Sequence, residues 1–272
     1  MPDGLPERLT PPFEYSLAYL EPGRTLEYGD SQLIYPYKSV TKLFSAWAAL
    51  IAIDRQLASL EDEVEVGAGQ KRVVTLRHLL AHASGLDFDS DELLAEPETK
   101  RIYSNRGIEK AADHIAAATG TPFPQWTEDT VLAPLGLIET LIDGSPAYAG
   151  EGSIRDLIVF ARELLDPTLV SAELADEARA VVFPGLRGVT PGFGAYTDNT
   201  WGLGLEIKHQ KARTWFPRAA SPATFGHFGQ SGSLLWVDPE DGRGLVFLGA
   251  QPFGQWHKEH WQALGDYFLH TF

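Results

Sequence analysis

The stretch Ser39-Val40-Thr41-Lys42 places a serine and a lysine three residues apart at the head of an apolar helix. Residues at positions i and i+3 of a helix share one face, so the hydroxyl and the amine of this pair can meet. A partly desolvated lysine is driven toward its neutral form and can take the proton that makes an ordinary serine a poor nucleophile. Because the S-x-x-K spacing also arises by chance in solvated helices, the segments around it decide its meaning.

Working outward from this pair, hydrophobic periodicity predicts helices in the middle of the chain and strands at both ends. This order indicates an α+β protein in which an antiparallel sheet, built from both chain ends, is flanked by helices and carries an inserted helical subdomain. The predicted strands cover residues 13–20, 25–28, 231–237 and 245–250, and the predicted helices cover residues 40–51, 75–83, 107–119, 154–165 and 256–268.

No Pro/Ser-rich linker separates independent modules, so residues 1–272 are predicted to form a single domain. We expect a sheet lobe from residues 1–45 plus 195–272, and a mostly helical lobe from residues 46–194. Gly-rich stretches at 185–194 and 202–204 mark the return of the chain to the sheet.

Composition excludes several classes of function. The formal net charge of -15 argues against nucleic acid or an anionic membrane surface as a partner. The chain has no cysteine, which excludes a disulfide framework, a thiolate metal site and a cysteine nucleophile. Residues 1–12 contain no apolar run, so no secretory signal is expected and a cytoplasmic location is predicted.

Tyr103-Ser104-Asn105 precedes a predicted helix and is therefore expected to lie on a loop. A phenol can relay protons, and an amide can hold a lysine or a substrate carbonyl. The alternative is that Tyr103 belongs to the core while Asn105 caps the next helix.

The segment Gly226-His227-Phe228-Gly229-Gln230-Ser231-Gly232 is rich in glycine and leads into a predicted strand. Glycine permits close approach of the backbone to a ligand, so this edge can supply an N–H group to a developing oxyanion. The alternative is a β-bulge or a tight bend, which is a common use of such glycines.

In this order, Ser39-x-x-Lys42, Tyr103-x-Asn105 and His227-x-Gly229 resemble the three motifs of the serine β-lactamase and penicillin-binding protein superfamily. The likeness is to its class C-like branch of esterases and D,D-peptidase-like enzymes, and it implies a β-lactamase-like fold. Other segments, at residues 75–86, 132–137, 155–157 and 236–239, are also similar to landmarks of that family.

The resemblance implies a role for each motif residue. Ser39 would be the acylated nucleophile, and Lys42 would accept its proton together with the Tyr103 hydroxyl. Asn105 would anchor Lys42 and a substrate amide or carbonyl. The backbone N–H groups of Ser39 and Gln230 would form the oxyanion hole, with His227 and Gly229 in the third motif. No metal or organic cofactor is implied.

His227 is the main departure from the family pattern, because β-lactamases carry a lysine there in a K-T-G motif. A lysine is cationic and suits a substrate carboxylate, whereas a histidine is mostly neutral at pH 7. The chain has no K-[S/T]-G, no S-D-N triplet and no E-x-x-L-N segment. Ester cleavage is therefore favoured over β-lactam hydrolysis.

Four other histidines are predicted to have no catalytic or metal-binding role. His78 and His82 have the i, i+4 spacing of a zinc pair, but a metalloprotease helix would carry glutamate at Leu79. Packing and capping are expected for this pair, and surface positions on the last helix for His257 and His260.

Three further features are left outside the candidate site. Gly229-Gln230-Ser231-Gly232-Ser233 misses the nucleophile elbow because its fifth residue is not glycine. Lys38 is expected to be a surface charge, with substrate contact as the alternative. Glu151, between two glycines, either projects into the cleft or marks a simple turn.

The predicted function is that of a serine hydrolase acting through an acyl-enzyme on small carboxylic esters or amides. One alternative is a β-lactamase or a D,D-peptidase-like amidase. Another is a catalytically silent ligand-binding protein, consistent with a chain shorter than is usual in this branch. The sequence leaves the natural substrate and the oligomeric state open.

Overall fold

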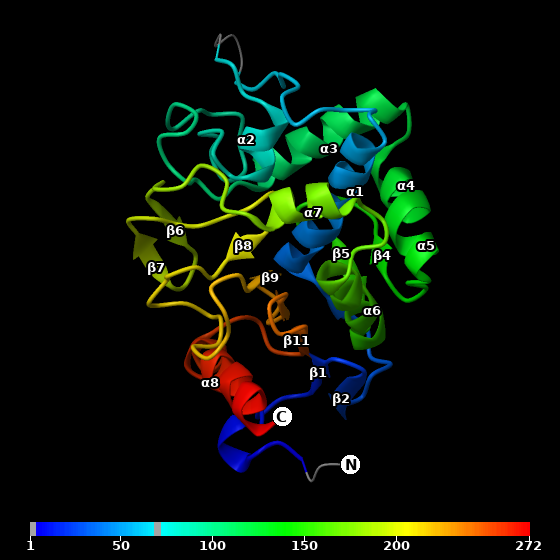
Figure 1. Ribbon diagram of the computed structural model, residues 1–272, viewed down its shortest axis with the longest axis vertical. Coiled ribbons are helices and arrows are strands. Elements are labelled where there is room, and N and C mark those ends of the chain that lie inside the picture. Colours follow the sequence, from blue (N-terminus) through cyan, green and yellow to red (C-terminus); the bar gives the residue numbers. More distant parts are fainter. Residues whose placement is uncertain (1–3, 68–71) are drawn as a thin grey trace.

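The computed structural model describes residues 4–67 and 72–272, and its largest element is a six-stranded antiparallel sheet (Figure 1). Strands from both ends of the chain pair at its centre, as the sequence predicted, because β1 lies between β2 and β11. The strands in order across the sheet are β2 (Arg24–Gly29), β1 (Tyr15–Glu21), β11 (Arg243–Gly249), β10 (Leu234–Asp238), β9 (Phe225–Phe228) and β8 (Glu206–Ile207).

Both faces of this sheet are buried. Successive side chains of a strand point to opposite faces, so alternate residues of β1 enter two different cores. Ala18 and Leu20 pack in the core that contains α1 (Thr41–Asp54) and α6 (Ile154–Leu165). Leu17 and Tyr19 pack in a second core under α8 (Gln255–Thr271). The alternate residues of β1 therefore belong to two different cores, and neither face of the strand meets solvent.

The second core is strongly aromatic, and it corrects one prediction. His257 is buried within it, with Phe13 and Trp261 beside its ring, so the surface position predicted for His257 is wrong. Residues 257, 261, 264 and 268 share one face of α8, and that face covers the sheet. His260 lies off this face, half-buried and stacked on Trp256.

The helical region surrounds α1, which is buried along almost its whole length. Serines cap two of its neighbours, because Ser104 accepts a hydrogen bond from Gly107 and Ser153 accepts one from Asp156. The cap at Ser153 was predicted, whereas the helix predicted from residue 107 begins at Asn105. The remaining helices and helical turns are η1 (Glu7–Leu9), η2 (Lys38–Val40), α2 (Leu76–Leu80), α3 (Asn105–Thr119), α4 (Phe123–Thr127), η3 (Glu128–Leu132), α5 (Ala133–Leu135) and α7 (Ala172–Arg179).

Two small antiparallel sheets were not predicted. One joins β3 (Tyr35–Pro36), β5 (Gly150–Gly152) and β4 (Leu141–Ile142) beside α1, and the other is the hairpin of β6 (Gly188–Thr190) and β7 (Gly194–Tyr196). The hairpin uses the Gly-rich stretch 185–194, which therefore does not enter the main sheet directly. Strands of two or three residues are too short to produce a periodic signal.

No helix in the described part of the chain is long and apolar enough to span a bilayer.

Phe160 on α6 stacks on Phe44 of α1 with ring centroids 3.8 Å apart, and it joins the two helices beneath the sheet. Because its side chain is fully buried, Phe160→Ala should lower the free energy of unfolding by about 3–5 kcal/mol in urea titrations. Its exposed neighbour Val159 provides the control, and Val159→Ala should change that free energy by no more than about 0.5 kcal/mol. Equal effects of the two substitutions would contradict this account of the core.

Candidate active site

Ser39 lies in η2, the single helical turn that leads into α1. The preceding residue, Lys38, has a left-handed backbone with φ of 48° and an exposed side chain. The Ser39 hydroxyl is partly exposed, and its Oγ lies 3.5 Å from Nζ of Lys42 one turn later. The helix register therefore brings the predicted pair together.

The Lys42 side chain is completely buried. Its Nζ donates to Oδ1 of Asn105 at 2.6 Å and to the carbonyl oxygen of Ala147 at 2.8 Å. Burial disfavours the charged form and lowers the pKa of Lys42 to about 7, although the carboxylates of Asp89 and Glu109 oppose this shift. A substantial fraction of Lys42 is therefore neutral at pH 7.

Asn105 is the first residue of α3 and connects Lys42 to the surface. Its Oδ1 accepts from Lys42, and its Nδ2 donates to Oδ1 of Asp89 at 2.9 Å. The alternative role as helix cap is wrong, because the Ser104 hydroxyl caps α3. Asp89 and the Ala147 carbonyl were not predicted. An exposed aspartate and a main-chain oxygen give no sequence signal.

Tyr103 and His227 face each other across the site. The Tyr103 hydroxyl lies 3.4 Å from Nε2 of His227, whereas Nδ1 of His227 lies 2.7 Å from the carbonyl oxygen of Phe228. A carbonyl only accepts, so Nδ1 carries the ring proton and Nε2 is an acceptor for the phenol.

Neither of these two side chains is charged at neutral pH. Burial, together with the nearby charge of Lys42, lowers the pKa of His227 to about 3. Burial also raises the pKa of Tyr103, although the neighbouring Ser39 hydroxyl opposes the shift. The phenol therefore keeps its proton and is suited to relay one rather than to act as a standing base.

The third motif is held close to Ser39 by contacts with the main chain of Tyr37. His227 belongs to strand β9, and residues 229–233 form the tight turn into β10, so the predicted strand at 231–237 begins only at Leu234. Ser233 Oγ donates to the carbonyl oxygen of Tyr37 at 2.5 Å. A Cβ on Gly229 would lie 2.4 Å from that same oxygen, so only glycine fits there.

Ser39 and Gln230 line one small cavity of about 90 Å³, which we call the catalytic cavity. The Gln230 side chain is exposed, and the role expected for this residue is that of its backbone N–H group. The buried Trp201 and Glu206, which were not predicted, also line the cavity. Both Glu206 oxygens are already occupied, by Thr190, Lys211 and Trp215. The other lining residues are Phe88, Tyr103, Thr190, Pro191, His227 and Phe228.

The catalytic cavity is not lined by Glu151, Lys38, His78 or His82. Glu151 is exposed on the short strand β5, and the Lys38 ammonium lies 6.0 Å from the Tyr148 ring centroid. His78 completes a capping box with Thr75, and Nδ1 of His82 accepts from the backbone of Ser104. The two histidines therefore pack and cap, as predicted.

Comparison with known proteins identifies the family. Residues 30–266 match the family model described as Beta-lactamase, so the chain belongs to the beta-lactamase family. A Salmonella gallinarum protein named "Putative D-alanyl-D-alanine carboxypeptidase" is 25% identical over 202 residues, which cover 58% of this chain. The chain spans only 46% of that relative's length.

Two solved structures share the fold of this chain. A crystal structure of a beta-lactamase from Mycobacterium bovis is 39% identical, with a TM-score of 0.90 over 95% of both chains. A D-stereospecific amidohydrolase from Streptomyces is 19% identical, with a TM-score of 0.72 over 91% of this chain and 92% of that one. The predicted β-lactamase-like α+β fold is thereby confirmed.

The environment of Lys42 leads to a direct prediction. In NMR titrations of protein labelled at the lysine side chains, Lys42 should titrate near pH 7, far below the ordinary lysine value near 10.4. Asp89→Asn keeps an oxygen for Asn105 but removes a charge that favours the ammonium form, so it should lower the Lys42 pKa further. The exposed Asp176 supplies the control, and Asp176→Asn should leave this pKa unchanged. A Lys42 pKa near 10 would contradict this description of the site.

Proposed function

We propose that the chain is a serine hydrolase that cleaves small carboxylic esters through an acyl-enzyme formed on Ser39. The observation that carries the proposal is the arrangement of hydrogen bonds around Lys42. A neutral amine has two N–H groups and one lone pair. Asn105 and Ala147 accept from the two N–H groups, which leaves the lone pair for Ser39 at 3.5 Å.

Acylation begins when Lys42 takes the Ser39 proton, either directly or through the Tyr103 hydroxyl. Oγ then forms a bond to the ester carbonyl carbon. The backbone N–H groups of Ser39 and Gln230 stabilise the oxyanion. When the C–O bond of the ester breaks, the leaving alcohol takes a proton from Tyr103, which is restored by Lys42.

Deacylation repeats these steps with water as the nucleophile. Neutral Lys42, acting with Tyr103, accepts a proton from the water molecule that attacks the acyl carbon. Breaking the bond between Oγ and the acyl carbon releases the carboxylic acid and returns the proton to Ser39. The relay needs Tyr103 to remain a neutral phenol, which its raised pKa supports.

The neutral state of His227 favours esters over substrates that must be bound by a carboxylate. Carboxypeptidase and β-lactam substrates carry such a group, and a charged hydrogen bond contributes about 1.5–3 kcal/mol. His227 provides no charge for it, because its pKa lies near 3. A D,D-peptidase-like or β-lactamase activity remains the second candidate, because the curated relatives are named as carboxypeptidases.

Replacing the nucleophile tests the central assignment. Ser39→Ala should lower kcat/KM for 4-nitrophenyl acetate by at least about a thousandfold while the fold is retained in circular dichroism. Ser231→Ala, which changes the serine of the rejected elbow sequence, is the matched control and should retain activity. Undiminished hydrolysis by Ser39→Ala would disprove the assignment.

A fluorophosphonate probe separates an enzyme from a silent homologue. Mass spectrometry of the treated protein should find a single adduct, on Ser39, because only an activated serine attacks phosphorus readily. The Ser231→Ala protein should give the same adduct. Absence of any adduct would favour the ligand-binding alternative.

The pH profile follows from the Lys42 titration. Only neutral Lys42 accepts the Ser39 proton, so kcat/KM should rise with pH through about 7 and fall away as Lys42 becomes protonated below it. Asp89→Asn should move this limb to lower pH, in step with the Lys42 pKa measured by NMR. If the acidic limb of the kcat/KM profile does not shift together with the Lys42 pKa, the base is another group.

Substrate preference distinguishes the two enzyme candidates. A chromogenic cephalosporin should be turned over roughly ten- to a hundredfold less efficiently than the ester, reflecting the missing charge on His227. Ser39-dependent loss of the β-lactam band at a rate equal to ester cleavage would establish the second candidate instead.

A further inference from the structure

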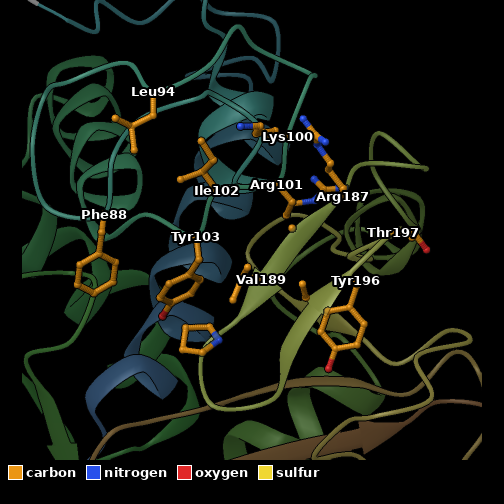
Figure 2. A pocket seen from close by; sticks show the side chains of 13 residues that line it. Phe88, Leu94, Lys100, Arg101, Ile102, Tyr103, Arg187, Val189, Tyr196 and Thr197 are labelled. Atoms are coloured by element: carbon orange, nitrogen blue, oxygen red, sulfur yellow. The ribbon is translucent and has the colours of Figure 1, made fainter.

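A second, larger cavity of about 760 Å³ opens beside the catalytic cavity, and we call it the side cavity. Figure 2 shows its two walls. One wall is the segment from Phe88 to Tyr103, and the other is the hairpin of β6 and β7. A hydrogen bond from the Arg101 backbone N–H to the Arg187 carbonyl, 2.9 Å long, joins the two walls. The cavity is therefore built into the fold and is not a gap between loose loops.

The two cavities share part of their lining. Phe88, Tyr103 and Pro191 border both of them. A molecule whose reacting carbon lies at Ser39 can therefore extend past Tyr103 into the side cavity. The catalytic cavity itself, at about 90 Å³, is much smaller than the side cavity, so the smaller part of a substrate fits there beside the carbonyl.

The walls of the side cavity are apolar and exposed. Phe88 is 45% exposed, Leu94 51% and Val189 55%, and all three line the same space. Exposed apolar side chains gathered around one hollow indicate a binding surface, because an apolar occupant would remove them from water.

Two cations lie at the end of the side cavity away from the Tyr103 hydroxyl (Figure 2). Lys100 and Arg187 are exposed, and within the described residues neither forms a salt bridge. Asp and Glu are absent from the residues that line the cavity. In a chain with a formal net charge of -15, two adjacent cations without carboxylate partners form a local site for an anion.

A third cation at this cavity is not available to a ligand. Arg101 is buried, and its guanidinium donates to the main-chain carbonyls of Ala81, Val182, Phe183 and Asn199. These hydrogen bonds use the guanidinium donors of Arg101 to join separate segments of the chain. The anion site therefore consists of Lys100 and Arg187.

The position of Tyr103 decides which half of an ester enters the side cavity. In the proposed mechanism Tyr103 protonates the leaving oxygen, and Tyr103 stands between the two cavities. The group attached to that oxygen therefore extends into the side cavity, while the acyl group remains beside Ser39.

We propose that the preferred substrates are esters of a small acyl group with an apolar alcohol or phenol that carries an anionic group. Hydrolysis forms the bond between Oγ and the acyl carbon, breaks the ester C–O bond and releases the anionic alcohol with a proton from Tyr103. Water then releases the small carboxylic acid. This inference rests on the proposed ester hydrolase function.

A matched pair of substrates tests the anion site. The probes are the acetate ester of 3-(4-hydroxyphenyl)propanoate and the same ester with the carboxylate replaced by a neutral methylamide. The ratio of kcat/KM for the anionic over the neutral ester should exceed one in the unmodified protein. In the Lys100→Gln/Arg187→Gln double variant it should fall by about three- to tenfold, as expected for two exposed ion pairs.

A control double variant removes equal charge elsewhere. Arg213 and Lys258 are exposed and line a different hollow. Arg213→Gln/Lys258→Gln should leave the ratio unchanged. In the unmodified protein, 1 M NaCl should lower it toward one. The same ratio in the unmodified protein and in the Lys100→Gln/Arg187→Gln variant would overturn the proposal.

A swapped ester tests the orientation. Propyl 3-phenylpropanoate places the bulky group on the acyl side. We expect slower turnover than for its isomer 3-phenylpropyl propanoate, which carries the bulk on the leaving side and also releases a primary alcohol. Faster turnover of the first compound would show that the side cavity holds the acyl group, contrary to the proposal.

A binding measurement separates this proposal from the function on which it rests. If no ester is cleaved by any variant, calorimetric binding of free 3-(4-hydroxyphenyl)propanoate to Ser39→Ala still reports on the side cavity. Binding that weakens when Lys100→Gln and Arg187→Gln are added, but not when Arg213→Gln and Lys258→Gln are added, would support the anion site alone. Equal binding by all three proteins would overturn it.

Discussion

The burial of the Lys42 amine is the constraint on which the candidate site depends. An ammonium ion in a protein interior loses its hydration, and nearby dipoles and charges compensate only in part, so the neutral amine is favoured. The two N–H groups of that amine are taken by Asn105 and Ala147, which come from distant parts of the chain. What remains is a lone pair beside Ser39. Desolvation and hydrogen bonding together suit this residue pair to the roles of base and nucleophile that we propose for it.

The rest of the fold excludes water from the Lys42 amine and positions the residues around it. Ser39 lies in the turn η2 that leads into α1, and α1 carries Lys42 through the middle of the molecule, packed between the main sheet and the helical region. Tyr37, two residues before Ser39, is fixed at both ends. Its hydroxyl contacts Thr140 and the carbonyl of Ser153, and its own carbonyl accepts from Ser233 beyond β9. The third motif is thereby tied directly to the turn that presents Ser39.

Much of the fold could be predicted from the sequence because its signals are local. Alternating apolar residues mark β1, Ser153 marks the start of α6, and α8 has a long helical period. His257 shows where such reasoning fails. Its type suggests a surface position, yet the aromatic core beneath α8 encloses it. The short strands β3 to β7 escaped prediction because two or three residues give no periodic signal, and only pairing with a neighbouring strand defines them.

The sequence by itself determined the family resemblance and the motif residues, since their order and spacing are properties of the chain. Only the tertiary structure decided the protonation states of their side chains. A substantial fraction of Lys42 is neutral at pH 7 because its side chain is buried, and His227 is a neutral acceptor because the Phe228 carbonyl fixes its tautomer. Asp89, the Ala147 carbonyl and the side cavity likewise depend on segments that meet only after folding. Burial and contact across the chain have no sequence period, and for that reason they appear only in three dimensions.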